Sequence, residues 1–374
     1  MGARQTEDDM TRDGYAKMTG ISTAILATVA VGWVLNTAHA ILVPIVWGAL
    51  LAFLMDGISR EMERLPVYTR IVPPWMRMTM TAIVLFLFLF LGVGFFARNM
   101  EPVVRAIPTY VDSLSVIVSE QAGRFDYEVE LTWQSIDKLL DDNIDLQVAL
   151  RYALNSLSYS AGYVALVCLY AILFLFERNA IKTKISAIVP DDEARAQVWQ
   201  TIDMLISQIG TYFTMKTLIN VVLGVICYLI FLVFGVEFAA FFAVLTAIFN
   251  YIPYVGSWIA MALPMLFAVG QFGLSSELLL LFASLSAAQF GIGYFWEPRL
   301  MGRSMNISPV VVMVSLAAWT AIWGGAGAIL SVILTSAVVT IMALFPGSRP
   351  LAILLTNDGN LPEPYPASKV EETG

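Results

Sequence analysis

Charge is scarce in this sequence. Only 13% of the 374 residues are Asp, Glu, Lys or Arg, whereas a soluble domain carries about 25%. There is a single histidine, His39, and there are two cysteines, Cys168 and Cys227. One histidine excludes the usual multi-histidine metal sites, so neither a metal nor a cofactor is expected. Both cysteines lie inside apolar runs without a partner at disulfide or metal-ligand spacing, which indicates small buried hydrophobes.

Enzyme signatures are also missing. The sequence has no Walker A lysine motif, no G-x-S-x-G, no H-E-x-x-H and no Rossmann fingerprint. The net charge of −8 argues against a nucleic-acid partner. We therefore expect a protein that is not an enzyme, and any active transport would have to draw on an ion gradient or on a partner.

Apolar sequence is abundant instead. Hydrophobic residues make up 58% of the chain, and the charges are confined to short stretches between long runs of Leu, Val, Ile, Phe and Ala. A bilayer core needs about 20 apolar residues per helix. The predicted fold class is an all-α polytopic membrane protein with about eight transmembrane segments, two of them broken or re-entrant, plus amphipathic helices outside the membrane.

Six apolar runs are continuous, and two longer tracts are interrupted. The continuous runs are 21–36, 40–56, 78–97, 158–176, 217–235 and 276–296. The interrupted tracts are 238–270 and 308–345. A straight helix over the second tract would be about 57 Å long, nearly twice the hydrocarbon thickness, so it must bend, turn or re-enter. An A-x-A pattern at 38–40 follows a leader that is too acidic for a signal peptide, so the first run is expected to be retained.

The distribution of Lys and Arg predicts the orientation. If each continuous run crosses once and each interrupted tract returns to its starting side, sixteen of the 21 basic residues face one side. The positive-inside rule then places both termini in the cytoplasm. The expected segments are a cytoplasmic tail (1–20), three transmembrane helices (21–97), an extracytoplasmic amphipathic segment (98–157), a fourth transmembrane helix (158–176), a cytoplasmic amphipathic helix (177–216), a bundle with broken helices (217–346) and a flexible cytoplasmic tail (347–374).

The first interrupted tract holds the strongest functional signal. It reads FNYIPYVGS over residues 249–257. Proline removes a backbone donor, and in hydrocarbon the freed groups must be satisfied by protein or by cavity water. A helix break with clustered polar side chains is typical of a transporter's substrate path. The alternative is a Pro–Gly turn with interfacial tyrosines. The residues expected to line the path are Asn250, Tyr251, Pro253, Tyr254, Gly256 and Ser257.

The second tract contains three glycines, Gly324, Gly325 and Gly327, after two tryptophans. These glycines allow close helix packing or a reversal of direction. Two opposed broken hairpins would meet at a midplane site with helix ends pointing at the ligand. The alternative is a single kinked helix packed through small residues.

Polar residues between the two tracts are candidate gate residues: Gln289, Glu297, Arg299 and Arg303. The arginines could instead anchor the topology. Lys216, at the start of the fifth run, is expected to extend its amine to the cytoplasmic face. The run Pro190-Asp191-Asp192-Glu193 predicts a helix start, with acidic residues in the first turn.

These residues resemble the AI-2E (autoinducer-2 exporter) family of bacterial transporters. The clearest matches are NYIPYVGS at 250–257 and EPRLMGR at 297–303, with supporting matches at 44–53, 215–217 and 309–312. The resemblance implies a multi-pass protein of the bacterial inner membrane that forms a homo-oligomer, with a pentamer as one candidate. It also implies export of the quorum-sensing signal autoinducer-2, although other members are associated with sodium/proton exchange.

The leading hypothesis is a secondary transporter or exporter of a small polar metabolite, autoinducer-2-like by family resemblance. One alternative is a Na+(Li+)/H+ antiporter, which needs a titratable carboxylate near the midplane. Glu237, Glu277 and Glu297 all fall near predicted span ends, which disfavours it. A second alternative is a non-transporting membrane scaffold. The expected partners are a small polar solute, H+ or Na+ as a coupling ion, the lipid bilayer and further copies of the chain.

Overall fold

The computed structural model describes residues 20, 22–23, 26–63, 72–123, 146–189, 191–301 and 306–361. Regular structure in these residues is helical, with no strand among them, which confirms the predicted all-α class. After a short apolar helix, Leu26–Thr37, the elements are α2 (His39–Glu63), α4 (Pro74–Gly123), α6 (Leu146–Ile188), α7 (Asp192–Phe234), α8 (Ala239–Phe249), α9 (Val255–Phe272), α10 (Ser276–Phe290), the π-helical turn η1 (Gly291–Trp296), α11 (Glu297–Met301), α12 (Pro309–Ala343) and α13 (Arg349–Leu355).

Several of these helices are long and apolar enough to cross a bilayer. In the described ranges, six stretches qualify: His39–Ser59, Thr79–Ser119, Asp192–Phe234, Val255–Phe272, Ser276–Met301 and Pro309–Ala343. Three shorter apolar helices accompany them: Leu26–Thr37, Gly162–Glu177 and Ala239–Phe249. This set agrees with the predicted polytopic membrane fold.

Single helices run through several of the segment boundaries expected from sequence. α4 continues from the apolar run at 78–97 into the amphipathic segment that follows it. α7 begins where predicted, because Asp191 caps it by accepting a 2.8 Å hydrogen bond from the Ala194 N–H. The N-terminal tail up to residue 19, the amphipathic stretch around Trp133 and the tail from 362 lie outside the described residues.

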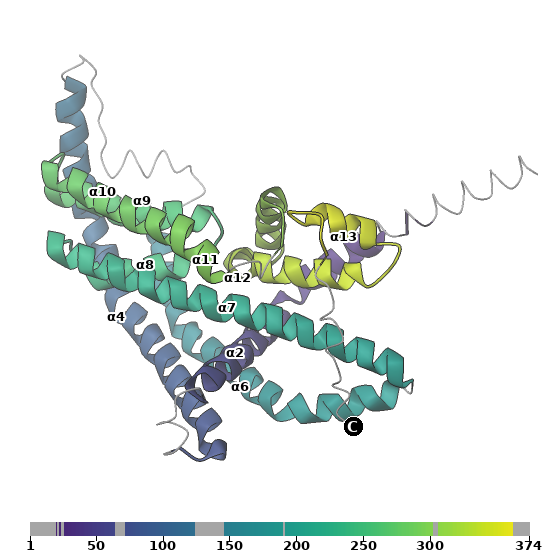
Figure 1. Cartoon of the computed structure of the whole chain (residues 1–374). Coiled ribbons are helices and arrows are strands. Elements are labelled where there is room, and N and C mark those ends of the chain that lie inside the picture. Colours follow the sequence, from purple (N-terminus) through teal and green to yellow (C-terminus); the bar gives the residue numbers. More distant parts are fainter. Residues whose placement is uncertain are drawn as a thin grey trace, which may run out of the picture.

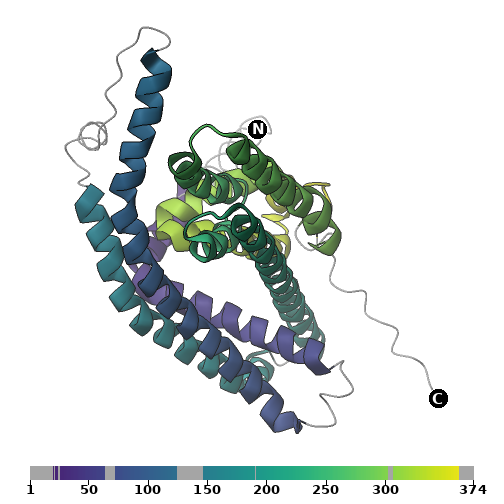
Figure 2. The ribbon, with the colours of Figure 1, turned by 90° about the vertical axis from the view of Figure 1, so that its left-hand side faces the viewer.

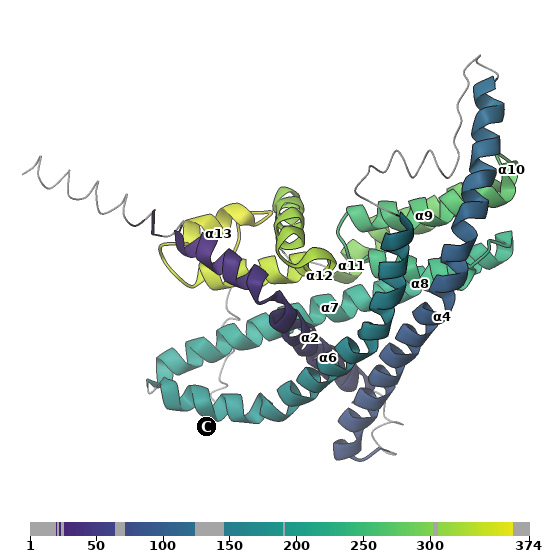
Figure 3. The ribbon, with the colours of Figure 1, turned by 180° about the vertical axis from the view of Figure 1, so that it is seen from behind.

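Two groups of helices pack along α7. Figure 2 shows α2, α4 and α6 side by side in one layer. α8, α9 and α10 form the second group and lie with the C-terminal half of α7 (Figure 1). Figure 3 shows α12 and α13 at the opposite end of the molecule from α10. α7 therefore connects the hairpin that contains the candidate path to the C-terminal helices.

Each group has its own buried apolar cluster. Phe231 and Cys227 of α7 belong to the cluster shared with α8 and α9, whereas Met55 of α2 and Cys168 of α6 belong to the cluster between α2 and α6. Both cysteines are free and buried, as predicted. Gly48 permits the close approach of α2 and α6, since a Cβ there would lie 2.5 Å from the Cβ of Tyr170.

Candidate substrate path and gate

The first interrupted tract is a helical hairpin. α8 ends at Phe249 and α9 begins at Val255, with residues 250–254 as the turn between them. The Thr246 hydroxyl donates to the carbonyl of Ala260 over 3.3 Å, although fourteen residues would separate them by about 21 Å in a straight helix. The chain therefore reverses direction here.

Two backbone features make this turn tight. A Cβ on Gly256 would lie 1.8 Å from the carbonyl oxygen of Phe249, so no larger residue fits without movement. Tyr254 has φ 58° and ψ −58°, a conformation that non-glycine residues rarely adopt. Its side chain is 54% exposed and forms no hydrogen bond with any described residue. Pro253 lies in the turn itself. Gly256 and Tyr254 thus shape the turn, and the Tyr254 side chain does not join the polar cluster behind it.

That polar cluster joins the hairpin to α7. The Asn250 amide donates from Nδ2 to Oδ1 of Asn220 over 2.7 Å. The Ser257 hydroxyl donates to Oδ1 of Asn250 over 3.1 Å. One turn away, the Tyr251 hydroxyl donates to the Thr217 hydroxyl over 2.7 Å. Two of the predicted path residues, Asn250 and Tyr251, therefore meet two residues of α7 that were not predicted, and Ser257 joins them through Asn250.

Asn220 is the member of this cluster with an unused donor. Its side chain is 2% exposed, and its Nδ2 has no hydrogen-bond partner in the part of the chain that the structure describes. A buried amide left unpaired costs about 1–3 kcal/mol, so native folds rarely keep one without a reason. The Asn220 Nδ2 therefore stands out among the buried polar atoms of the described residues.

A buried ion pair lies next to the cluster. The Lys216 ammonium donates to Oε1 of Glu297, with the two side chains 7% and 24% exposed. Lys216 is only 5% exposed, so its amine does not extend into solvent; the face of the membrane at which it lies stays a prediction. Its amine turns inward because a carboxylate on α11 is within reach, and an opposite charge offsets the cost of burying an ammonium.

The π-helical turn η1 positions Glu297 for this contact. The backbone N–H of Glu297 bonds to the carbonyl of Ile292, five residues earlier. One extra residue in a turn rotates everything that follows by about 100° relative to a continuous α-helix. The sequence signal for this turn is weak, because Gly291 and Gly293 in an apolar run do not by themselves specify a π-helix.

Two other candidate gate residues, Arg299 and Gln289, do not bond to Glu297. The Arg299 guanidinium lies over the ring of Phe295, 5.8 Å from its centre. Gln289 lies on α10 and forms no hydrogen bond with Glu297 or with any other residue that the structure describes. Arg303 lies outside the described residues. Of the three candidates that the structure describes, only Glu297 is thus joined to the path.

The second interrupted tract also folds back on itself. Gly324 has φ 60° and ψ −139° inside α12, which no helix accommodates. The Trp319 indole N–H donates to the Thr335 hydroxyl over 3.1 Å, although a straight helix would separate them by about 24 Å. A Cβ on Gly327 would lie 1.9 Å from the carbonyl oxygen of Trp319. α12 is therefore two helical segments joined by a sharp turn.

The two tracts meet at one apolar cluster. Tyr251 of the first turn packs against a cluster that includes Phe213 of α7 and Trp323 of α12. The rings of Tyr251 and Phe213 are 6.0 Å apart. Tyr251 thus has its hydroxyl in the polar cluster and its ring against Phe213, in the apolar cluster to which Trp323 of α12 also belongs.

Comparison with known proteins identifies the family. The model of the "AI-2E family transporter" family matches residues 23–347. The chain belongs to this family. It is 27% identical to a putative transport protein of Haemophilus influenzae, over 91% of this chain and 96% of the relative. It is 26% identical to the AI-2 transport protein TqsA of Escherichia coli, over 86% and 90%, and 31% identical to the putative transport protein YhhT of the same species, over 54% and 57%.

As an AI-2E family transporter, the chain is a multi-pass membrane transport protein. Its relatives are named as transport proteins rather than as enzymes, in agreement with the prediction from the missing enzyme motifs. Among the residues that the structure describes, no group of three or more His, Cys, Asp and Glu side chains could hold a metal ion.

Sequence reasoning missed the contribution of α7 to this site. Lys216, Thr217 and Asn220 follow one another at spacings of one and three residues, which places them on one face of a helix. An amide and an ammonium inside an apolar run were the available signal, since polar groups in such runs are usually functional. Their partners are 30 to 81 residues away in sequence and could not be read from spacing alone.

Proposed function

We propose that this AI-2E family transporter is a secondary exporter of a small, uncharged polar metabolite of the autoinducer-2 type. The observation that carries the proposal is the buried Asn220 amide, whose Nδ2 is unpaired within the described chain beside Asn250 and Ser257. Amides and hydroxyls pair with the hydroxyl groups of sugar-like solutes, since each can donate or accept. The name of the E. coli relative supports the choice of solute.

The path would run along the face of α7 that contacts the hairpin turn. Tyr251 would offer its ring for stacking and its hydroxyl for hydrogen bonding. Lys216 and Glu297 would form the inner gate, because their ion pair joins α7 to α11. In this arrangement both termini are in the cytoplasm and the protein is in the bacterial inner membrane. The distribution of basic residues supports that orientation.

Replacement of Asn220 tests the path. In proteoliposomes, Asn220→Leu should lower export of autoinducer-2 at least about tenfold, the effect of losing one hydrogen bond worth roughly 1.4 kcal/mol in the transport complex. Asn250→Ala should act in the same direction. Asn99→Leu is the matched control, because its amide bonds within its own helix to the carbonyl of Phe95. Unchanged export by both path variants would contradict the assignment.

A second candidate function is sodium/proton exchange. It is favoured by the Lys216–Glu297 pair, which places a partly buried carboxylate beside an ammonium, as proton-coupled transporters often do. If it operates, sodium-loaded vesicles should show proton movement, reported by a pH-sensitive dye, that Glu297→Gln abolishes. Glu277→Gln at the exposed start of α10 is the matched control. Wild-type vesicles without sodium-dependent proton movement would remove this candidate.

A further inference from the structure

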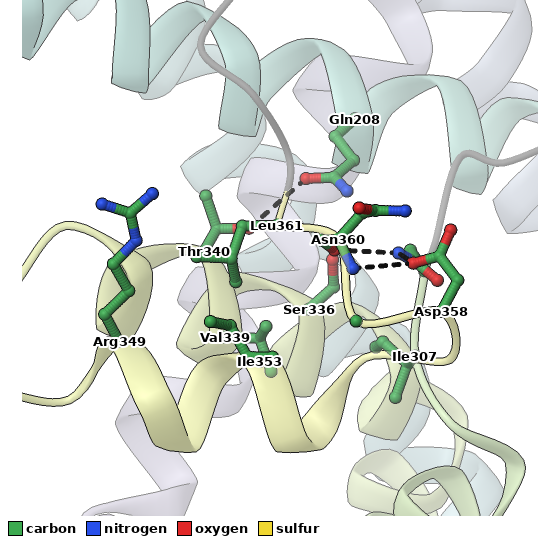
Figure 4. A pocket seen from close by; sticks show the side chains of 12 residues that line it. Gln208, Ile307, Ser336, Val339, Thr340, Arg349, Ile353, Asp358, Asn360 and Leu361 are labelled. Atoms are coloured by element: carbon green, nitrogen blue, oxygen red, sulfur yellow. Dashed lines mark hydrogen bonds between the residues drawn. The ribbon is translucent and has the colours of Figure 1, made fainter.

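A pocket lies apart from the path, between α7, α12, α13 and the segment that follows α13 (Figure 4). Its volume of about 470 Å³ is within the range of small-molecule sites, about 300–1,000 Å³. Polar side chains from all of these parts line it: Gln208, Asn306, Ser336, Thr340, Arg349 and Asp358. None of these residues belongs to the Asn220–Asn250 cluster.

Two hydroxyl groups of α12 face the pocket. Ser336 and Thr340 are four residues apart on one helix face and are 4% and 3% exposed. The Thr340 hydroxyl donates to Oε1 of Gln208 over 3.5 Å. Ser336 as a residue is 4% exposed and lines the pocket, and its hydroxyl forms no hydrogen bond with any residue in the described ranges. An unpartnered hydroxyl that faces a cavity is a group with which a polar ligand can pair.

Asn306 fixes the wall opposite these hydroxyls. Its Nδ2 donates to the carbonyl of Asn360 over 3.0 Å and also to the carboxylate of Asp358. Its Oδ1 accepts from the backbone N–H of Asn357 over 3.3 Å. Ser308 adds a backbone bond of 3.0 Å to the carbonyl of Leu355. The segment after α13 is therefore tied to the start of α12, and the pocket has a defined wall.

The charged residues of the pocket lie at its margins. Figure 4 shows Arg349 on one side and Asp358 on the other. Arg349 is exposed and forms no ion pair with the part of the chain that the structure describes. The Asn306 amide and the Asn360 N–H hold the pKa of the Asp358 carboxyl below its usual range, so that charge is already engaged. The polar side chains that line the pocket between these two charges carry amides and hydroxyls.

We propose that this pocket binds a small uncharged solute with adjacent hydroxyl groups, of the sugar or polyol class. Neutral amides and hydroxyls match such a solute, because each can donate to one hydroxyl and accept from another. Val339 and Ile353 supply the apolar surface on which its carbon skeleton rests. The inference does not depend on the proposed path, since binding is measured without transport.

Binding of D-ribose to the full-length protein in lipid nanodiscs tests the proposal by isothermal titration calorimetry. Ser336→Ala and Thr340→Val should each weaken D-ribose binding at least tenfold. Ser331→Ala should not, because that buried hydroxyl on the same helix bonds to the carbonyl of Ala328 and does not line the pocket. Equal affinity in all three variants, or no D-ribose binding to the unaltered protein, would overturn the proposal.

Two further measurements test whether a loss of D-ribose binding comes from misfolding or from the proposed path instead of from the pocket. The single variant Ser336→Cys should react with N-ethylmaleimide, and D-ribose should slow the reaction; an unchanged rate would count against the pocket. Ser336→Ala added to Asn220→Leu should still weaken D-ribose binding at least tenfold relative to Asn220→Leu alone. No further loss in that double variant would move the site to the path, and competition by inorganic phosphate at equal affinity would rule out the uncharged class.

Discussion

Lys216, Thr217 and Asn220 lie on one face of α7, and each contacts a different part of the site. Lys216 pairs with Glu297 of α11, Thr217 accepts from Tyr251 in the hairpin turn, and Asn220 accepts from Asn250. A single helix face therefore holds both the proposed gate and the proposed path. A change in the position of α7 would alter the two together.

The residue on which the hairpin turn depends most is Gly256. Gly256→Ala should lower the free energy of unfolding by about 1–3 kcal/mol, because the added Cβ would lie 1.8 Å from the carbonyl oxygen of Phe249. Thermal unfolding in detergent, followed by tryptophan fluorescence, measures the loss. Gly291→Ala is the control, since nothing lies within 4 Å of a Cβ there. Equal midpoints for the two variants would show that the turn relaxes without cost.

At the scale of elements, the sharp turn in α12 depends on the backbone conformation of Gly324 and not on a lack of room for a side chain there. Gly324 has a positive φ with ψ near −139°, and nothing lies within 4 Å of a Cβ placed on it. Its neighbour Gly325 has equally open surroundings without a positive φ. The two glycines therefore differ in conformation alone, and they form a matched pair for measuring the cost of the reversal.

Gly324→Ala should destabilise the protein by about 1–3 kcal/mol through backbone strain. Gly325→Ala should be neutral or stabilising by up to about 1 kcal/mol, because alanine is favoured over glycine in a helix. Thermal unfolding of both variants checks this. If Gly324→Ala unfolds at the same temperature as Gly325→Ala, α12 does not need the sharp turn.

At the scale of the whole molecule, one polar contact ties the long helix α4 to the hairpin group. The Tyr110 hydroxyl donates to Oε2 of Glu237 over 2.6 Å, and the Glu237 backbone N–H donates to Oε1 of Gln271 over 3.0 Å. The Tyr110 ring also packs on Phe267, with ring centres 4.6 Å apart. The layer of α2, α4 and α6 is thereby joined to α9 at a point far along the sequence.

A double-mutant cycle measures this connection. Tyr110→Phe keeps the ring contact and removes the hydroxyl, so Tyr110→Phe and Glu237→Gln should show a coupling energy of about 0.5–1.5 kcal/mol in thermal unfolding. Tyr294→Phe on η1 is the control, because its side chain is 71% exposed. A coupling energy of zero would mean that apolar packing, such as the Tyr110–Phe267 and Phe96–Phe241 ring contacts, holds α4 in place.

The sequence by itself determined the fold class and the family. Continuous apolar runs of helix-spanning length with few charges predict transmembrane helices, which satisfy every backbone hydrogen bond within the segment in hydrocarbon. The motifs at 250–257 and 297–303 led to the family that the comparison then showed. The helix breaks within the two interrupted tracts are at residues 250–254 and at Gly324. Proline and glycine act on the backbone locally, so such features are readable from sequence.

Only the tertiary structure decided which partner each polar side chain has. From the sequence alone, Lys216 is expected to extend to the surface, because its partner Glu297 on α11 is 81 residues away. Asn220 is recognisable only as an amide in an apolar run, and the run does not show its partner Asn250. Nor does the sequence bring Ser336 and Asn306 to one pocket. These contacts join residues far apart in the chain, whereas helical periodicity predicts only neighbours three or four residues away. The recognition chemistry of this protein therefore arises from packing between helices.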